Sequence, residues 1–450
     1  MNRTSVGLLA VTAFFISACN PQPGLPEPGG KASVRAINAI PASPAINFSI
    51  EERSVSSIAY KASSGTSRYD DFSYTFNFDV LFFGEGSARR VASRNIDFQT
   101  GKDYTLLVSG ELASPTITLW EGDERTFTDA DTVFEAKFAH AAASLGTVDY
   151  YFDDPAVTPT LGNQVATLAF GEATAALDYG EGAYVLTITA AGDPDAVLYV
   201  SDSTAIGARN AFLFTAFDGD VSDTAPTVVR AIAVQGNSVS LPDPTYPPTL
   251  QFINASMDLG SVDIYTDEAL SSNIVADHAF ADITAELPVA PGETTLYYTP
   301  AGDTAAVTLQ SDFTITGGRR YQAIANGVAG ALGVTALIPN RLSESTRVRL
   351  LPFQASNNFA LLDIYAVPAG ESIDDNSPVR IGLARTEISA ASGLTSGSYD
   401  IYVTEFAQKV VLAGPYPIDV VIGDVVEMII VDTDDPGVLD VLFLSGGPAT

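Results

Sequence analysis

The residues best suited to chemistry in this sequence are aspartates that gather in short loops. Asp218 and Asp220 are followed closely by Asp223, and acidic turns also occur at residues 129–131 and 432–435. Calcium prefers several oxygen ligands converging from one tight loop, so Asp218, Asp220 and Asp223 are the candidate metal ligands. None of these loops has EF-hand spacing, and a solvated acidic turn has the same composition. Calcium therefore stays the less favoured alternative, and no other cofactor is expected.

The sequence contains few side chains that could serve as catalytic bases or zinc ligands. The chain contains two histidines, His140 and His278, and a single cysteine. A serine triad needs a base within hydrogen-bond reach, and the sequence shows no G-x-S-x-G, P-loop or H-E-x-x-H motif. Two histidines and one cysteine are also too few for a zinc site of the usual kind. We therefore expect a protein that is not an enzyme.

Aromatic side chains are the other candidate binding groups, because they can serve as platforms for sugar rings. The candidates are the tyrosine pairs at 150–151 and 297–298, together with Tyr246 and Trp120. Adjacent side chains in a strand face opposite sides of the sheet, so we expect one tyrosine of each pair in the core and the other exposed. Packing roles explain these residues equally well, and the identity of any ligand stays open.

The only cysteine, Cys19, ends a segment with the features of a secretion signal. Apolar residues 6–18 have the length of a signal-peptide core and are too short to span a bilayer. The Ile-Ser-Ala-Cys sequence that ends at Cys19 resembles the bacterial lipobox, and this resemblance implies cleavage of residues 1–18 and lipidation of Cys19. Asn20 follows, and its similarity to the Gram-negative sorting pattern favours the outer membrane. An ordinary signal peptide with an incidental cysteine is the alternative.

Charge and composition restrict the classes of partner expected for the mature chain. Residues 19–31 are rich in proline and glycine, which predicts an extended tether behind the lipid. The chain has 54 acidic and 22 basic residues, a formal net charge of −32. Such a surface repels phosphate backbones, so no nucleic acid is expected as a partner. The expected partners are the lipid bilayer, through the acylated N-terminus, and an envelope protein or glycan.

The segments expected to position these side chains belong to a sequence repeat that occurs four times. A polar residue between an apolar residue and alanine recurs at Asn38, His140, Asn254 and Gln354. Nine residues later, inside a strand-like run, stand Asn47, Asp149, Asp263 and Asp363. We expect His140, which stands where the other repeats carry Asn38, Asn254 and Gln354, to be a strand position with a local polar partner. We expect the second residue of each set to face outward and tie down a turn, and a functional ligand is the alternative role for it.

Each repeat is expected to be a β-sandwich. Apolar and polar residues alternate with period two, and turn residues separate the short runs at intervals typical of β-proteins. Seven or eight strands in about 100 residues are typical of an immunoglobulin-like sandwich. We predict an all-β protein with four such domains in tandem, at residues 32–128, 129–245, 246–343 and 344–450. Proline-rich segments near the second and third boundaries are expected to act as short, semi-rigid linkers.

The repeat resembles the domain-of-unknown-function family numbered 4397. The resemblance rests on residues 148–150, 169–171 and 182–184 in the second repeat and on residues 101–105 in the first. The first and fourth repeats depart most, and Arg385 replaces the expected aromatic residue. The family consists of bacterial extracellular, immunoglobulin-like domains, often in tandem on lipoproteins. The resemblance therefore implies a binding or structural module of the cell envelope, without catalytic residues.

Specificity should lie where the repeats differ. The longest repeat-specific loops are predicted near residues 153–163, 217–226 and 368–378, and loops on a rigid scaffold commonly carry function. We expect a non-catalytic envelope lipoprotein that presents its domains for protein or glycan binding or as a structural spacer. The alternative is a calcium-stiffened surface stalk of adhesin type.

Overall fold

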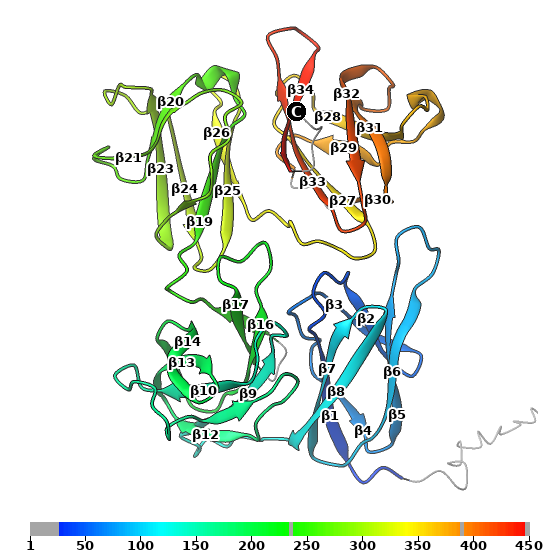
Figure 1. Ribbon diagram of the computed structural model, residues 1–450, viewed down its shortest axis with the longest axis vertical. Coiled ribbons are helices and arrows are strands. Elements are labelled where there is room, and N and C mark those ends of the chain that lie inside the picture. The colour runs from blue at the N-terminus through cyan, green and yellow to red at the C-terminus, as the bar shows by residue number, and fades with distance from the viewer. Residues whose placement is uncertain (1–26, 234–236, 388–390, 446–450) are drawn as a thin grey trace, which may run out of the picture.

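The computed structural model describes residues 27–233, 237–387 and 391–445 (Figure 1). The leader and Cys19 lie outside the described residues, so cleavage and lipidation stay predictions. The described chain folds into β-strands, with two short 3₁₀-helices, η1 (Met257–Leu259) and η2 (Ile373–Asp375). Within the described residues, no helix has the length and apolar character that crossing a membrane would require.

The first and second sandwiches are built from two sheets each. The first contains β1 (Lys31–Asn38), β2 (Ile46–Ile50), β3 (Arg53–Ile58), β4 (Ser67–Asp70), β5 (Ser73–Val80), β6 (Arg89–Asp97), β7 (Lys102–Glu111) and β8 (Ser114–Asp123). The second contains β9 (Val133–Ala141), β10 (Val148–Asp153), β11 (Ala166–Leu168), β12 (Leu177–Gly180), β13 (Gly182–Ala190), β14 (Asp193–Val200), β15 (Thr204–Ile206), β16 (Ala211–Asp218), β17 (Thr227–Ala233) and β18 (Ser238–Leu241). Their sheets have the orders β4-β1-β7-β8 and β3-β2-β5-β6, then β12-β9-β16-β17-β18 and β11-β10-β13-β14, with β15 paired to β13.

The third and fourth sandwiches repeat this plan. The third contains β19 (Thr249–Asn254), β20 (Val262–Tyr265), β21 (Asn273–His278), β22 (Leu287–Pro288), β23 (Gly292–Pro300), β24 (Leu309–Ile315), β25 (Arg320–Asn326) and β26 (Gly333–Leu337). The fourth contains β27 (Val348–Gln354), β28 (Leu361–Pro368), β29 (Arg380–Ala384), β30 (Ser392–Leu394), β31 (Gly397–Glu405), β32 (Val411–Val420), β33 (Val425–Asp432) and β34 (Leu439–Ser445). Their sheets have the orders β22-β19-β25-β26 and β21-β20-β23-β24, then β30-β27-β33-β34 and β29-β28-β31-β32.

The prediction of tandem β-sandwiches is confirmed, and each sandwich encloses its own apolar core. In β2, for example, Ile46, Phe48 and Ile50 point into the core, because alternate side chains of a strand lie on one face. The strand order differs in detail from the seven-stranded immunoglobulin plan. The first strand of each sandwich lies inside its sheet and pairs in parallel with a late strand, as β1 does with β7.

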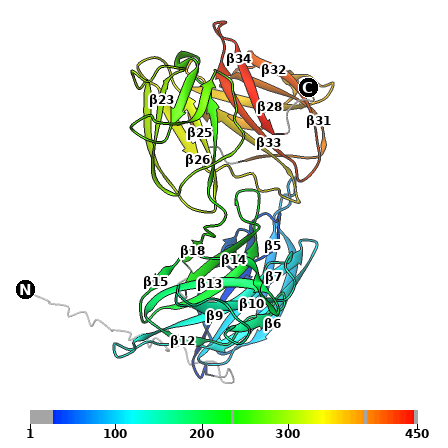
Figure 2. The same ribbon diagram turned by 60° about the vertical axis from the view of Figure 1, so that its left-hand side comes forward.

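The four sandwiches lie as two side-by-side pairs and do not form a linear row (Figures 1 and 2). The first and second form the lower pair in Figure 1, and the third and fourth form the upper pair. Within each pair, the sheets that contain the parallel strands face each other. Their outer faces supply one apolar cluster per pair. The first cluster includes Ile37, Leu107, Ala139 and Leu213, and the second includes Ile253, Ile324, Phe353 and Ile429.

The proline-rich segment after β18 is fixed at both of its ends. The carbonyl oxygen of Leu241 accepts a hydrogen bond from the Tyr199 hydroxyl in the second sandwich. The carbonyl oxygen of Pro248 accepts one from the backbone N–H of Val289 in the third sandwich. Each end of this segment is therefore tied to the sandwich that it enters.

Candidate functional site

The three candidate calcium ligands lie in the β16–β17 loop, where three sandwiches meet. The Lys61 Nζ atom of the first sandwich forms ion pairs with the carboxylates of both Asp220 and Asp223. Arg319 of the third sandwich donates a hydrogen bond to the second carboxylate oxygen of Asp223, at 3.0 Å. The side chains of Lys61 and Asp223 are each 3% exposed. Cationic side chains therefore occupy the positions that a calcium ion would need.

Asp218, the third candidate, has different hydrogen-bond partners. Its carboxylate accepts hydrogen bonds from the backbone N–H of Ser144, at 3.1 Å, and from the Ser144 hydroxyl. Its backbone carbonyl accepts a 3.0 Å hydrogen bond from the Tyr60 hydroxyl of the first sandwich. Among the described residues, no group of three or more His, Cys, Asp or Glu side chains is placed to hold a metal ion.

The electrostatics of this junction favour the ionised form of Asp220. Burial by itself would raise the pKa of Asp220, but the charge of Lys61 and hydrogen bonds from Lys61 and Ser222 lower the pKa below its ordinary 3.8. Burial, followed by the charges of the nearby aspartates, raises the pKa of Tyr60 far above its usual value, so its hydroxyl stays a hydrogen-bond donor.

The ion pairs continue into the upper pair of sandwiches. The Arg320 side chain donates to the backbone carbonyl of Asp223 and pairs with Glu286. Arg341, on the connection to the fourth sandwich, bonds Glu286 at 3.3 Å and Glu427 of β33 at 2.7 Å. We call this set the interdomain ion network; its members are Lys61, Asp220, Asp223, Arg319, Arg320, Glu286, Arg341 and Glu427. It links all four sandwiches.

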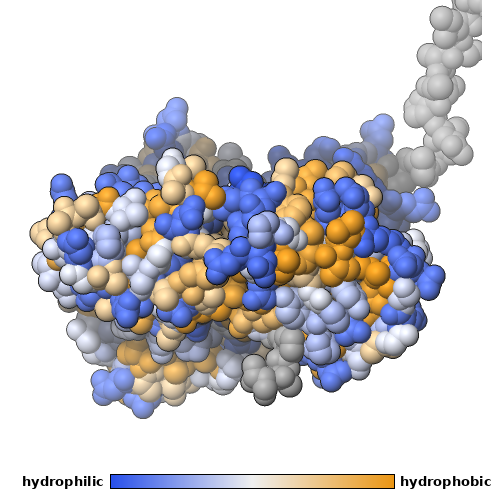
Figure 3. All heavy atoms as spheres, turned by 90° about the horizontal axis from the view of Figure 1, so that it is seen from above, coloured by the Kyte–Doolittle hydropathy of each residue, from blue (hydrophilic) through white to orange (hydrophobic). Residues whose placement is uncertain are grey.

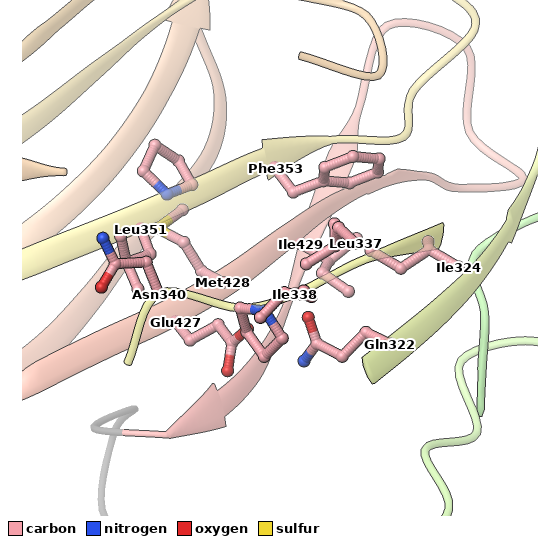
Figure 4. A pocket seen from close by; sticks show the side chains of 12 residues that line it. Gln322, Ile324, Leu337, Ile338, Asn340, Leu351, Phe353, Glu427, Met428 and Ile429 are labelled. Carbon is pink, nitrogen blue, oxygen red and sulfur yellow. The ribbon is translucent and has the colours of Figure 1, made fainter. Parts of the chain in front are cut away.

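A cleft opens between the third and fourth sandwiches at the end of this network (Figure 4). Ile324 and Leu337 line it from one side, and Phe353 and Met428 line it from the other. Its accessible space is about 70 Å³, far below the several hundred Å³ of small-molecule pockets. Glu427, its acidic lining residue, is paired with Arg341. The cleft is therefore part of the contact between the two sandwiches.

His140 has the local polar partner expected from the sequence, and the equivalent residues of the other repeats have similar partners. Asn38 and Asn254 accept a hydrogen bond from the backbone N–H two residues on, and His140 does the same through Nδ1. The His140 Nε2 atom lies 2.9 Å from the carbonyl oxygen of Gly146, to which it donates. Gln354 donates to the carbonyl oxygen of Phe359. These side chains hold the turn that follows the first strand of each sandwich.

The recurrent aspartates do tie down turns, but they are buried, not exposed. Asp263 accepts hydrogen bonds from the backbone N–H groups of Asp277, at 2.8 Å, and Gly302, at 3.0 Å. Asp363 accepts from Gly382 and Ala407 in the same way. Each carboxylate thus joins a residue of the adjacent edge strand, β21 or β29, to the turn after β23 or β31.

The aromatic candidates separate into packing residues and surface residues. Tyr150 lies in the core, as expected for one member of the pair, but Tyr151 is also buried, at 1% exposure. The expectation that it is exposed was wrong: its cross-strand partner Thr187 on β13 is also buried, and the loop after β10 contacts the end of the same face. Asn163 of the loop donates a 3.3 Å hydrogen bond to Asp153, which lies on the same face as Tyr151.

The remaining aromatic candidates divide in the same manner. Trp120 of the first sandwich donates a hydrogen bond to the carbonyl oxygen of Gly171 in the second and packs in their shared cluster. Tyr298 is in the core of the third sandwich, whereas Tyr297 is half-buried and lines a surface groove. Tyr246 is exposed. The 297–298 pair therefore follows the alternation expected of a strand.

Of the three predicted specificity loops, one has a structural role. Residues 217–226 form the junction with Lys61, while the loops after β10 and β28 project from the outer sides of the second and fourth sandwiches (Figure 1). The fourth-sandwich loop contains η2 and is held by Lys409, whose Nζ donates to the carbonyl oxygens of Ile373, Asp374 and Asn376.

The sequence analysis did not single out Lys61, Arg319 or Arg341. The available signal was the scarcity of basic residues, 22 in all, combined with a break in the repeat. Lys61 occupies the turn position that Gly171 and Ala281 hold in other repeats, and all three have positive φ. A rare cation at a repeated turn position indicates a role specific to that repeat.

Comparisons with known proteins identify the repeat but no activity. The family model described as Domain of unknown function (DUF4397) matches residues 32–151 and 248–365. Each match covers one full sandwich and the first two strands of its paired neighbour. No curated protein matches the chain.

One solved structure with similarity is titled "The Bacillus anthracis TIE protein", with 10% sequence identity and a TM-score of 0.15. The similarity covers 86% of this chain and 66% of that one, so this chain spans slightly less than two thirds of its length. That score is too low to indicate a shared overall arrangement. The family model, in contrast, covers more than half of the 450 residues in two separate copies, and the chain therefore belongs to the DUF4397 family.

Proposed function

We propose that the chain is a non-catalytic lipoprotein of the bacterial cell envelope that presents recognition surfaces on one rigid, four-sandwich body. The observation that carries this proposal is the interdomain ion network, together with the apolar cluster inside each pair. Domains fastened in this way hold their surface loops at fixed separations. Fixed spacing reduces the ordering cost when several contacts must form on one partner at once.

Two surface regions with exposed apolar side chains favour a binding role over a passive spacer. The loop after β10 exposes Leu161, at 65%, and Val157, at 48%. The fourth sandwich exposes Ile381, Phe406 and Val410, and Figure 3 shows apolar surface gathered over that sandwich, in its right half. Grouped exposed apolar side chains are typical of interaction sites.

The anchor sets which sandwiches face outward. Lys31, the first residue of β1, lies at the end of the lower pair that faces away from the upper pair (Figure 1). Residues 19–31, if extended, reach roughly 30 Å or more from a lipid on Cys19. In the proposed outer-membrane location, the third and fourth sandwiches are then the part of the body farthest from the membrane.

The test is capture of an envelope partner by a lipid-free chain of residues 32–450. We expect a protein or glycan to be retained, and we expect its retention to fall when residues 157–161 are replaced by Gly and Ser. A chain with the equivalent replacement in the loop after β28 provides the matched comparison. Retention of nothing by any chain would contradict the binding role and favour the spacer.

A further inference from the structure

A surface groove in the third sandwich combines an aromatic ring with oxygen-bearing side chains. Glu293, Thr295 and Tyr297 alternate along β23, which places them on one face of the sheet, and all three line the groove. Thr266 and Glu268, from the loop after β20, also line it. The groove holds about 440 Å³, within the range of small-molecule sites. It lies on the outer side of the upper pair, near β20 and β23 in Figure 1.

Several polar groups in this groove have capacity for a ligand. The Thr314 hydroxyl donates to one carboxylate oxygen of Glu293, at 2.8 Å, which orients that carboxylate and leaves its other oxygen available. None of the described residues forms a hydrogen bond with the Tyr297 hydroxyl or the Glu268 carboxylate. The groove therefore offers an aromatic ring, hydroxyl donors that include that of Tyr297, and several acceptors.

The charges of the groove restrict the class of ligand. Its lining contains two glutamates and no Lys, Arg or His, so a phosphate, a sulfate or an acidic sugar would meet only repulsion. A neutral sugar presents an apolar C–H face that can lie on an aromatic ring, and hydroxyl groups that donate to carboxylates. We propose that this groove binds a neutral oligosaccharide, with one sugar ring stacked on Tyr297 and its hydroxyls bonded to Glu268 and Glu293. This inference rests on the proposed recognition role and names its glycan-binding site.

The fourth sandwich supplies a matched control. Tyr402 occupies the position on β31 that Tyr297 occupies on β23, as the neighbours Ile401 and Leu296 show by their burial in equivalent cores. Asp400 and Ser398 precede it where Thr295 and Glu293 precede Tyr297, and the Ser398 hydroxyl donates to Asp419. Tyr402 therefore serves as the control position, because it is a half-buried tyrosine outside the proposed site.

The experiment titrates the lipid-free chain of residues 32–450 with chitotriose, cellotriose and maltotriose, followed by calorimetry and by tyrosine NMR signals. We expect saturable binding of at least one of these sugars. Tyr297→Ala should weaken it about tenfold, because stacking and ring burial are lost. Glu268→Gln should weaken it only a few-fold, because the amide still accepts a hydrogen bond, while Tyr402→Ala should leave it unchanged. Circular dichroism melting confirms that each variant is folded.

Three results would overturn the inference: no binding of any sugar up to about 10 mM, binding unaffected by Tyr297→Ala, or preferential binding of a lysine-rich hexapeptide at Glu268 and Glu293. The last would assign the groove to a cationic peptide. Capture of an envelope partner by the Tyr297→Ala chain separates the two proposals. If that partner is retained while the sugars fail, the recognition role stands and the groove assignment falls.

Discussion

Lys61 illustrates how one residue converts a turn into a contact between domains. It is the third residue of a turn that recurs in every sandwich, and its left-handed backbone directs its side chain to Asp220 and Asp223 in the next sandwich. Buried ion pairs contribute little net stability when complete, because desolvation offsets attraction. Removal of Lys61, however, leaves the largely buried Asp220 carboxylate without its cation and leaves Asp223 with Arg319 alone.

Lys61→Met should therefore lower the free energy of unfolding by about 3 kcal/mol, in the range measured for broken buried pairs. Lys31→Met is the control, because the Lys31–Asp70 pair is exposed and such pairs are worth less than about 1 kcal/mol. Urea unfolding of the lipid-free chain measures both values. Equal and small effects would mean that water reaches the junction and that the network does not fasten the sandwiches.

His140 makes stability depend on pH. Burial lowers its pKa below the ordinary 6.5, and both ring nitrogens are engaged in the neutral form. As pH falls through 6.5, the unfolded chain binds a proton that the folded chain resists, so stability is lost below that pH. His140→Asn keeps the turn, as Asn38 and Asn254 do elsewhere, and should reduce the drop in melting temperature between about pH 7.5 and 5.5. Asn254→His should enlarge that drop, and the absence of both changes would show that these positions do not govern the pH response.

At the scale of the element, the β16–β17 loop shows why acidic composition does not make a metal site. Asp220 and Asp223 sit beside Lys61, and Asp218 holds Ser144, so the three carboxylates do not converge on one point. A calcium site needs several oxygens around one centre. The loop instead uses its charges to bind neighbouring sandwiches.

Millimolar calcium should accordingly shift the melting curve no more than magnesium does at equal ionic strength. An ion bound only to the native state at 100 times its dissociation constant would add about 2.7 kcal/mol and raise the melting temperature by several degrees. Scanning calorimetry in each salt distinguishes the two cases. A calcium-specific rise that disappears in an Asp218→Ala, Asp220→Ala chain would instead favour the calcium-stiffened stalk.

At the scale of the whole molecule, the contacts within a pair differ from those between pairs. An apolar cluster and ion pairs such as Lys61–Asp223 join the partners within the lower pair, and a second apolar cluster joins those of the upper pair. The two pairs are joined by contacts such as the Asp223–Arg319 ion pair and the backbone bond from Ser345 N–H to the Ala42 carbonyl. Figure 2 shows the narrower connection between the upper and lower pairs. The pair is therefore the natural unit of stability.

A fragment of residues 246–445 should accordingly be more stable than one of residues 246–341. The shorter fragment should fold, because the third sandwich has its own core, but it would expose Ile253 and Ile324 to water. Guanidinium unfolding followed by circular dichroism gives the comparison, with residues 32–445 as the reference. Equal stability of the third sandwich in both fragments would show that the interface within the pair does not contribute to its stability.

The attachment of the whole body is predicted to depend on Cys19. Cys19→Ala should abolish acyl labelling and release the chain from the membrane fraction, since several acyl chains form a firm anchor and nothing else in the proposal replaces them. By the same resemblance to the sorting pattern, Asn20→Asp should shift the lipidated chain to the inner membrane. A Cys19→Ala chain that resists a high-salt wash would reveal a second attachment.

The sequence by itself determined the fourfold β repeat and the duties of its recurrent residues. Strand alternation and turn chemistry act over a few residues, so the role of His140 could be predicted from its place in the repeat. The tertiary structure decided which outer faces are buried, as with Tyr151, and which charges meet, as with Lys61 and Asp223, which lie 162 residues apart. Alternation assigns a side chain to the outer face of a sheet, but only the packing of loops and neighbouring sandwiches on that face determines whether the side chain reaches solvent.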